Sequence, residues 1–334
     1  MNEIKNIAVI GSGSWATAIV KILGEKKVNL HWYIRRNEVV EHIKKYHHNP
    51  DYISSAELPT EQITFYTSAK EAIAMADWII VATPSAFLKN SLEGLTAEDF
   101  RNKKIISAIK GMIPDTDENR IIAEYFNQFF EIDFTNFIVI SGPCHAEEVA
   151  LEKLSYLTFS CPDTSKASSI ADLFACRFIK TNFTEDIYGT ELAAVMKNII
   201  ALASGICHGL GYGDNFQAVL VSNAIQEIKR FVDAVHPIER DIKGSAYLGD
   251  LLVTAYSQFS RNRSFGLMIG KGYSVKAAQL EMNMIAEGYY SVKCIYEANQ
   301  KYNVDLPITT AVYRILYERN SPMMEIKLMT EKLK

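Results

Sequence analysis

A lysine and an asparagine interrupt one of the most apolar stretches of the chain. Residues 191–204 read ELAAVMKNIIALAS, which is apolar nearly all round and predicts a buried helix with Lys197 and Asn198 in its middle. Burial disfavours the charged ammonium, so it lowers the pKa of a lysine and makes the amine usable for proton transfer near neutral pH. The neighbouring amide adds a hydrogen-bond donor and an acceptor. Lys197 and Asn198 are therefore candidate catalytic residues, and a lysine that extends to the surface is the alternative.

A second polar segment, GDLLVTAYSQFSRNRSFG, occupies residues 249–266. Asp250 can cap the helix that follows it, or it can hold Lys197 or a substrate hydroxyl. The tetrapeptide SRNR at 260–263 gathers hydroxyl, guanidinium and amide groups. Because arginine binds phosphate through two parallel hydrogen bonds, Arg261 is a candidate phosphate anchor, and an exposed turn is the alternative.

Small or polar residues follow four of the apolar runs that read as strands. They are Gly11–Ser14, Thr83–Ser85, Lys110–Gly111 and Ser141–Cys144. In open α/β sheets, ligands bind beyond the carboxyl ends of the strands. Lys110 directly follows the apolar run IISAI, so it can either place a cation in such a cleft or face water.

Residues 11–16 read GSGSWA and fit the pattern G-x-G-x-x-A. The motif follows a predicted strand and opens a helical pattern, which is the context of a dinucleotide-binding loop. Gly11 allows the tight turn, Gly13 lets the backbone approach a pyrophosphate, and Ala16 permits close packing of helix against strand. The pyrophosphate would lie at the helix N-terminus, where N–H groups and the helix dipole favour an anion. An ordinary glycine-rich turn is the alternative.

The residues after the second predicted strand bear on the choice of cofactor. This strand ends at Ile34 and is followed by Arg35 and Arg36, and the first acidic residue is Glu38. An enzyme strict for NAD usually places an acid at the strand end to hold the ribose 2′-hydroxyl, whereas arginines suit a 2′-phosphate. The sequence therefore predicts binding of NADP or NAD with NADPH preferred, and a solvated basic loop is the alternative.

The chain offers two kinds of framework for these residues. β-Branched runs that alternate with helical patterns predict a parallel sheet covered by helices. The strand candidates are 5–10, 29–34, 78–83, 104–109 and 137–141, with weaker ones near 63–66, 156–160 and 177–181. From about Thr184 helical periodicity dominates, with helix candidates at 186–207, 215–235, 247–258, 274–285, 288–302 and 308–318. We therefore predict an α/β, Rossmann-like NAD(P)-binding domain over residues 1–187 and an all-helical substrate and catalytic domain over residues 188–334.

Composition excludes several other classes of protein. The chain has 334 residues and a formal net charge of −4, so no global basic excess points to a nucleic-acid partner. Its five cysteines form no C-x-x-C pair and no metal-type cluster with histidine, which favours a reduced compartment and no metal site. The N-terminus lacks the features of a signal peptide, and Lys197 and Asn198 interrupt the run 192–203. We therefore expect a cytoplasmic protein without an integral membrane segment.

Taken together, these segments resemble the bacterial-type NAD(P)-dependent glycerol-3-phosphate dehydrogenases. The matching stretches occur in the family's order over nearly the whole chain. They are GSGSWATA (11–18), ATPS (82–85), IKG (109–111), SGPCHAEEVA (141–150), LAAVMKNIIALASGI (192–206), LGYGDN (210–215), GDLLVTAYSQFSRNRSFG (249–266), EGYYSVK (287–293) and LPI (306–308). The resemblance implies reversible hydride transfer between a nicotinamide cofactor and dihydroxyacetone phosphate or glycerol 3-phosphate, serving glycerophospholipid synthesis, in a homodimer.

The resemblance also implies roles for individual residues. Lys197 would donate and accept the proton, Lys110 would contact both substrate and nicotinamide, and Asn198 would help to orient the carbonyl. Further substrate contacts would come from Gly142, Cys144, Asp250, Ser260, Arg261 and Asn262. Cofactor contacts would come from Gly11, Gly13, Ser14, Trp15, Arg35, Arg36, Lys110, Ala146, Arg261, Ile285 and Glu287.

One loop departs from the family's pattern. After Ser-Gly-Pro the family commonly continues with Ser or Thr and then Phe, whereas this chain has Cys144 and His145. A thiol donates a weaker hydrogen bond than a hydroxyl does, which puts a side-chain contact at Cys144 in doubt.

Two other functions compete with that of a glycerol-3-phosphate dehydrogenase. One is another two-domain dehydrogenase of the 3-hydroxyacid or 6-phosphogluconate type, and the other is a non-catalytic dinucleotide-binding regulator.

Overall fold

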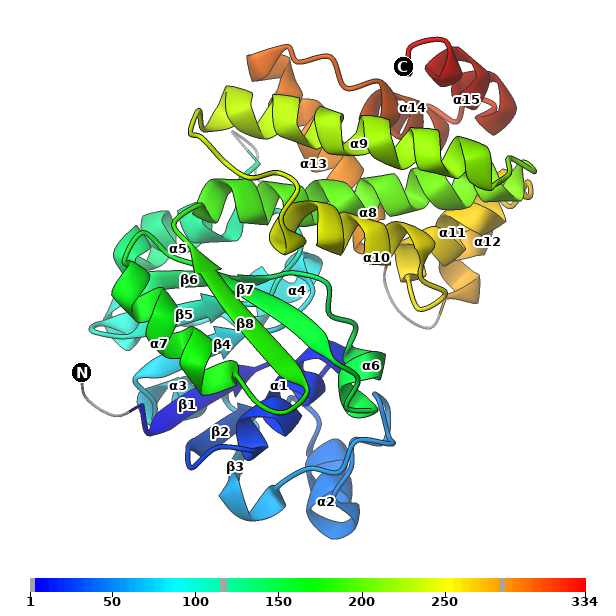
Figure 1. The fold of residues 1–334 in the computed structure, drawn as a ribbon. Helices are drawn as coiled ribbons and strands as arrows, with labels where there is room; N and C mark the ends of the chain where they lie inside the picture. Colours follow the sequence, from blue (N-terminus) through cyan, green and yellow to red (C-terminus); the bar gives the residue numbers. More distant parts are fainter. Residues whose placement is uncertain (1–3, 115–118, 283–285) are drawn as a thin grey trace. The chain divides into compact units, whose positions relative to one another are not determined.

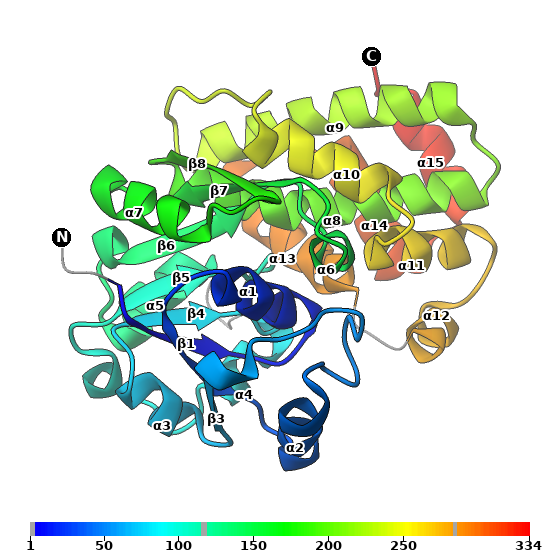
Figure 2. The same ribbon diagram turned by 60° about the horizontal axis from the view of Figure 1, so that its bottom comes forward.

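Short runs of aliphatic and aromatic residues form the strands of one eight-stranded sheet. The computed structural model describes residues 4–114, 119–282 and 286–334 (Figures 1 and 2). The strands are β1 (Asn6–Ile10), β2 (Asn29–Tyr33), β3 (Ile63–Tyr66), β4 (Trp78–Val81), β5 (Lys104–Ser107), β6 (Phe137–Ser141), β7 (Ser155–Ser160) and β8 (Ile179–Thr184). Their order in the sheet is β3-β2-β1-β4-β5-β6-β7-β8. All eight lie where the sequence predicts strands.

The six strands from β3 to β6 pair in parallel, as predicted, but β7 runs antiparallel to β6. The link between β6 and β7 holds only the five-residue helix α6 (Ala146–Ala150), so the chain turns back at the same edge of the sheet. A parallel partner would require a crossover, which usually contains a longer helix. β8 again pairs in parallel with β7, after the helix α7 (Thr164–Phe174).

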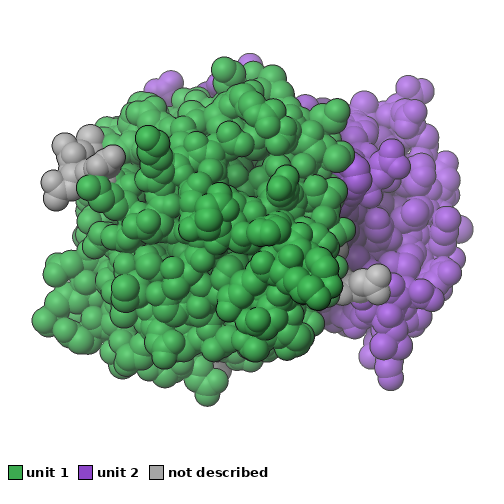
Figure 3. Space-filling model, turned by 90° about the horizontal axis from the view of Figure 1, so that it is seen from below, with its two compact units in different colours: residues 1–109, 122–187 green, residues 110–121, 188–334 purple. Residues whose placement is uncertain are grey.

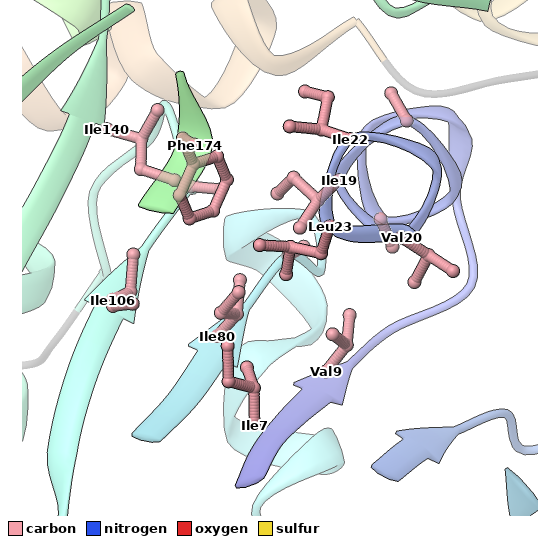
Figure 4. Packing of buried hydrophobic residues seen from close by; sticks show 14 of the residues in the cluster. Ile7, Val9, Ile19, Val20, Ile22, Leu23, Ile80, Ile106, Ile140 and Phe174 are labelled. Atoms are coloured by element: carbon pink, nitrogen blue, oxygen red, sulfur yellow. The ribbon is translucent and has the colours of Figure 1, made fainter. Parts of the chain in front are cut away.

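Helices cover both faces of the sheet, which explains why the strands are apolar on both sides. The remaining helices of this part are α1 (Ser14–Gly24), α2 (Asn37–Tyr46), α3 (Ala69–Ala74), α4 (Ser85–Ser91) and α5 (Ile122–Phe130), with 3₁₀ turns at Thr60–Gln62, Ala97–Phe100 and Phe134–Asn136. On one face, the strand residues Ile7, Val9 and Ile80 belong to the same buried cluster as Ile19 of α1 and Phe174 of α7 (Figure 4). The buried face of α1 thereby fixes the start of this helix beyond the end of β1.

The helical part of the chain is built around α8 (Ile187–Gly209). Its other elements are α9 (Asp214–Val235), a π-helical turn at Ser245–Gly249, α10 (Asp250–Tyr256), α11 (Arg261–Gly270), α12 (Val275–Glu281), α13 (Glu287–Tyr302), α14 (Pro307–Leu316) and α15 (Pro322–Thr330). The helices α11 and α15 were not predicted from the sequence, and the end of the helix predicted at 274–285 lies outside the described residues. The structure confirms the predicted fold class, an α/β domain followed by a helical domain.

Glycines allow the helices around α8 to approach it closely. A Cβ atom at Gly205 or Gly209 of α8 would come within 3.0 Å of the backbone of α11, and one at Gly266 or Gly270 of α11 would clash with α8 in the same way. Gly288 of α13 lies equally close to the backbone of α8. The N-terminal ends of α11 and α13 are thereby held next to the middle of α8.

Although Lys197 and Asn198 interrupt its apolar run, α8 is long and apolar enough to cross a membrane by length and composition. It is the one such helix in the part of the chain that the structure describes, and 89% of its most apolar 18-residue window is buried. A mostly buried core helix passes the same test, so this property of α8 is weak evidence for a membrane segment.

Residue contacts divide the chain into two compact units (Figure 3). Unit 1 comprises residues 1–109 and 122–187, and unit 2 comprises residues 110–121 and 188–334. The domains predicted from the sequence are 1–187 and 188–334, whereas by residue contacts the segment 110–121 groups with the helical unit. Asn119 shows one reason, because its side-chain amide donates to Glu297 of α13 (2.9 Å). Lys110 is therefore part of unit 2.

Candidate active site

The centre of unit 2 holds a buried ion pair between Lys197 and Asp250. Lys197 lies in the middle of α8, and Asp250 is the first residue of α10, just after the π-helical turn. The ammonium donates a hydrogen bond to Oδ1 of Asp250, and the two side chains are 6% and 2% exposed. Lys197 therefore does not extend to the surface, and the carboxylate of Asp250 is engaged by a lysine.

A second lysine approaches the same carboxylate. Nζ of Lys110 lies 3.4 Å from Oδ2 of Asp250, and its side chain is 19% exposed. Asp250 thus bridges two cations through its two oxygens. This shared contact joins the strand-end lysine, the helix-centre lysine and the acid of the GDL segment in one cluster.

The pKa values of both the base and the acid of this cluster are lowered, by burial in the case of Lys197 and by neighbouring charge in the case of Asp250. Burial lowers the pKa of Lys197 to about 7. The positive charge of Lys110 contributes to this shift, whereas the carboxylate of Asp250 opposes it. Burial alone would raise the pKa of Asp250, but the charges of Lys110 and Lys197 outweigh it and hold the pKa below its ordinary value. Near neutral pH the cluster therefore combines a fixed carboxylate with a lysine that can gain or lose a proton.

A chain of side-chain amides extends from this cluster. Nδ2 of Asn198 donates to the carbonyl oxygen of Lys110 (2.9 Å), and its Oδ1 accepts from Nδ2 of Asn262 (2.9 Å). Oδ1 of Asn262 in turn accepts the backbone N–H of Gly288 (2.9 Å). The two asparagines thereby link the backbone at Lys110 with the first turns of α11 and α13.

The segment 260–263 forms the start of α11. The hydroxyl of Ser260 caps this helix by accepting the backbone N–H of Arg263 (3.3 Å). Arg261 is the first residue of the helix and is exposed, whereas Asn262 is buried. Glu287 is the first residue of α13, and Ile285 lies outside the described residues. An anion at the start of α11 would meet both the arginine and the positive end of the helix dipole.

The glycine-rich loop of unit 1 has the geometry that a dinucleotide requires. Gly11 has φ +124°, and a Cβ atom there would lie 2.8 Å from the carbonyl oxygen of Ala82. At Gly13, the N-cap of α1, a Cβ atom would meet nothing within 4 Å, so a phosphate has room to approach the backbone. The indole N–H of Trp32 donates to the carbonyl oxygen of Gly11 (2.7 Å) and helps to hold the loop. These residues fit a dinucleotide.

Ser14 and Trp15 open α1, and Ala16 is completely buried, as close packing of helix against strand requires. Beyond β2, the exposed Arg36 is the N-cap of α2. Its guanidinium forms an ion pair with Asp51 and lies 3.9 Å from Glu38. Glu38 is the first acid after β2 in the sequence, whereas Asp51 was not predicted to lie here because it follows α2 rather than β2.

The loop after β6 is also fixed by a glycine. Gly142 has φ +108°, and a Cβ atom there would lie 2.7 Å from the carbonyl oxygen of Tyr156 on β7. Cys144 is 8% exposed, His145 is the N-cap of α6, and Ala146 is the first residue of that helix. Within the described ranges, no group of three or more His, Cys, Asp or Glu side chains could hold a metal ion.

Known proteins resemble this chain in both its dinucleotide-binding part and its helical part. The chain matches the family model of the NAD-dependent glycerol-3-phosphate dehydrogenase N-terminus over residues 6–167 and that of the C-terminus over residues 186–327. It is 35% identical to glycerol-3-phosphate dehydrogenase [NAD(P)+] from Clostridium botulinum strain Eklund 17B, over 97% of this chain and 96% of that protein. A protein of the same name from Staphylococcus carnosus is 32% identical over 98% of both chains.

Among solved structures, glycerol-3-phosphate dehydrogenase from Coxiella burnetii superposes with a TM-score of 0.89 and 26% identity. The match covers 98% of this chain and 99% of that chain. The family predicted from the catalytic and dinucleotide motifs is thereby confirmed. This chain belongs to the NAD-dependent glycerol-3-phosphate dehydrogenase family.

Proposed function

We propose that this chain is an NAD(P)-dependent glycerol-3-phosphate dehydrogenase, which interconverts dihydroxyacetone phosphate and glycerol 3-phosphate. The buried cluster of Lys197, Asp250 and Lys110 is the observation that carries the proposal. The dehydrogenases from Clostridium botulinum and Staphylococcus carnosus, whose names state this substrate, match nearly the whole chain. Glycerol 3-phosphate formed in this way would serve the synthesis of glycerophospholipids.

Reduction of a ketone to an alcohol requires one hydride and one proton. When bound, the nicotinamide supplies the hydride to the carbonyl carbon in the reducing direction and accepts it in the oxidising direction. Lys197 gives the proton to the carbonyl oxygen as the alkoxide develops, and it removes the same proton in the reverse reaction. A lysine whose pKa is lowered to about 7 can serve both directions near neutral pH.

Asp250 and Lys110 support this proton transfer electrostatically. The carboxylate of Asp250 holds the ammonium of Lys197 in one position, so the proton is presented from a fixed point. Lys110 brings a second positive charge to the cluster, which stabilises negative charge on the carbonyl oxygen in the transition state. Asn198 is buried, and the hydrogen bonds of its side-chain amide to the carbonyl oxygen of Lys110 and to Asn262 fix the backbone around the two lysines.

Arg261 is the proposed anchor for the substrate phosphate. It lies at the N-terminus of α11, where the guanidinium and the helix dipole both favour an anion. Holding the phosphate also positions the reacting carbon, so this remote contact serves catalysis as well as affinity. Gly142, Cys144, Ser260 and Asn262 remain proposed substrate contacts. Gly142, whose φ of +108° suits glycine, supports a contact through the loop backbone, which a thiol at Cys144 does not weaken.

Six of the proposed cofactor residues lie at the start of α1 and just after β2. Gly11, Gly13, Ser14 and Trp15 would hold the pyrophosphate at the helix N-terminus, and Arg35 and Arg36 would favour NADPH over NADH. The set is completed by Lys110, Ala146, Arg261, Ile285 and Glu287.

None of the five cysteines is in a disulfide, which supports the proposal of a reducing, cytoplasmic location. The proposed homodimer can be tested by sedimentation.

A substrate panel tests the proposed function against its rivals. Oxidation of NADPH and NADH would be followed with dihydroxyacetone phosphate, dihydroxyacetone, small 3-keto acids and other phosphorylated ketones. We expect turnover to be highest with dihydroxyacetone phosphate. Preference for a keto acid would indicate a hydroxyacid dehydrogenase, and cofactor binding without any turnover would indicate a regulator.

A further inference from the structure

The segment Asn49–Asp51, which follows α2, connects the two cofactor elements of unit 1. The side chain of Asn49 is completely buried. Its Nδ2 donates to the carbonyl oxygen of Ser12 (3.1 Å) and to Oγ1 of Thr17 (2.9 Å), so one amide holds both the glycine-rich loop and the first turns of α1. Its Oδ1 accepts the backbone N–H of Asp51 (3.0 Å). The position of Asp51 is therefore tied to that of the pyrophosphate loop.

The carboxylate of Asp51 lies against Arg36, at the end of β2. The two side chains form an ion pair, and the second acid near Arg36, Glu38, is 3.9 Å away. Arg35 is also exposed, and its side chain forms no ion pair with any residue that the structure describes. The two adjacent arginines are therefore in different electrostatic surroundings. The charge of Arg36 is shared with two acids, whereas that of Arg35 is not.

In many dinucleotide-binding folds an acid at the end of β2 accepts the ribose 2′-hydroxyl and repels a 2′-phosphate. This chain has arginine at that position, but the fold brings an acid to the same place from the segment after α2. Such an acid competes with a 2′-phosphate for the guanidinium, because both are anions that pair with arginine. It does not compete with a neutral 2′-hydroxyl.

We propose that Asp51 is a specificity-determining residue, which weakens the preference for NADPH by pairing with Arg36 and so keeps NADH usable. The proposal rests on the proposed function, since it assigns the cofactor of that same site. Arg35 then supplies most of the attraction for the 2′-phosphate, and Arg36 supplies only the part that Asp51 leaves available. Asn49 acts differently, because it holds the loop that both cofactors share.

Substituting Asp51→Asn tests this role with little change of shape. The dissociation constants of NADPH and NADH would be measured without substrate, by nicotinamide fluorescence at fixed ionic strength, beside kcat/KM for both. We expect the NADPH preference to rise about two- to fivefold, chiefly through tighter NADPH binding, because an exposed charge pair seldom contributes more than this. The rise should shrink in 0.5 M salt, where the Debye length falls to roughly 4 Å.

Three further variants make the result specific. Glu38→Gln, the matched acid farther from Arg36, should raise the preference less than Asp51→Asn does. Asn49→Ala should weaken NADPH and NADH binding alike. In an Arg36→Ala background, Asp51→Asn should no longer change the preference, because Asp51 acts through that guanidinium.

Two outcomes would overturn the role of Asp51. One is an unchanged preference in Asp51→Asn, and the other is an undiminished effect of that substitution when Arg36 is absent. A wild-type chain that binds neither dinucleotide would instead overturn the proposed function. Because the binding measurement requires no turnover, the two failures can be told apart.

Discussion

The ammonium of Lys197 and the carboxylate of Asp250 form an ion pair in which only 6% and 2% of the two side chains is exposed. Taking both charges out of water costs free energy, and their mutual attraction with good geometry offsets part of that cost. Lys110 reaches the other oxygen of the same carboxylate, 3.4 Å away. Asp250 therefore remains ionised, while Lys197 is the member of the cluster whose charge can change.

Replacing Lys197 with alanine tests the proposed proton donor. Loss of a positioned general acid typically costs about a hundredfold to ten-thousandfold in rate, so turnover of dihydroxyacetone phosphate should fall by at least about two orders of magnitude. Lys293→Ala provides a surface control in the same unit, since that side chain is 52% exposed on α13. Dinucleotide affinity should change little in both variants. Near-normal turnover in Lys197→Ala would assign the proton transfer to another group.

The lowered pKa of Lys197 predicts opposite pH profiles for the two directions of the reaction. Reduction needs Lys197 protonated, so kcat/KM for dihydroxyacetone phosphate should fall about tenfold per pH unit above a pKa of about 7. Oxidation needs the neutral amine, so kcat/KM for glycerol 3-phosphate should rise through the same pKa and then level off. Both profiles would be recorded between pH 5.5 and 9.5 at constant ionic strength. Profiles that stay flat up to pH 9 would show that Lys197 keeps an ordinary lysine pKa.

Part of the site could be predicted from the chain alone. The burial of Lys197 and Asn198 followed from an apolar pattern on every side of their helix, and the glycine-rich loop followed from its place between a strand and a helix. The partner of Lys197 could not be fixed in this way. Asp250 is 53 residues away, and its position before a helical pattern equally suited a helix cap. The carboxylate of Asp250 meets Lys197 because of how α8 and α10 pack together, and local sequence patterns carry no information on such packing.

The missed features have similar causes. Asn49 and Asp51 follow a helix and carry no recognisable motif, and they reach the cofactor elements only because the chain folds back after α2. The helix α11 was missed because Arg261–Gly270 has polar residues on several sides and a glycine at each of two contacts with α8. Gly205 and Gly209 are four residues apart, as are Gly266 and Gly270, and this spacing suits the close crossing of two helices.

Replacing Arg261 with alanine tests the proposed phosphate anchor. A hydrogen bond to a charged group contributes about 1.5–3 kcal/mol, so kcat/KM for dihydroxyacetone phosphate should fall roughly tenfold to a hundredfold or more. Because the phosphate contact also positions the reacting carbon, kcat should fall along with affinity. Dihydroxyacetone, which lacks the phosphate, serves as the internal control. Because Arg261 is also a proposed cofactor contact, the low turnover of dihydroxyacetone can fall as well, but it should fall far less than that of dihydroxyacetone phosphate. An equal loss for both substrates would exclude phosphate binding as the role of Arg261.

The side-chain amide of Asn262 joins Asn198 of α8 to the backbone of Gly288 on α13. Truncation to alanine leaves a buried N–H group and a buried carbonyl oxygen without these partners, and each such group costs about 1–3 kcal/mol. Asn262→Ala should therefore lower the free energy of unfolding by about 2–4 kcal/mol. Asn262→Asp keeps the acceptor for Gly288 but turns a carboxylate oxygen toward the oxygen of Asn198, so it should also destabilise the fold.

Chemical denaturation of both variants, beside Asn223→Ala on α9, checks this expectation. The amide of Asn223 donates to the carbonyl oxygen of Lys334 in a solvent-exposed contact, so its loss should change stability little. Steady-state kinetics then separates two roles for Asn262. A structural link predicts a loss of stability in both Asn262 variants, together with a fall in kcat as Lys110 and Lys197 lose their fixed positions. A residue that only contacts substrate predicts a raised KM with unchanged stability, and that result would show that the amide chain is not what holds α11 and α13 against α8.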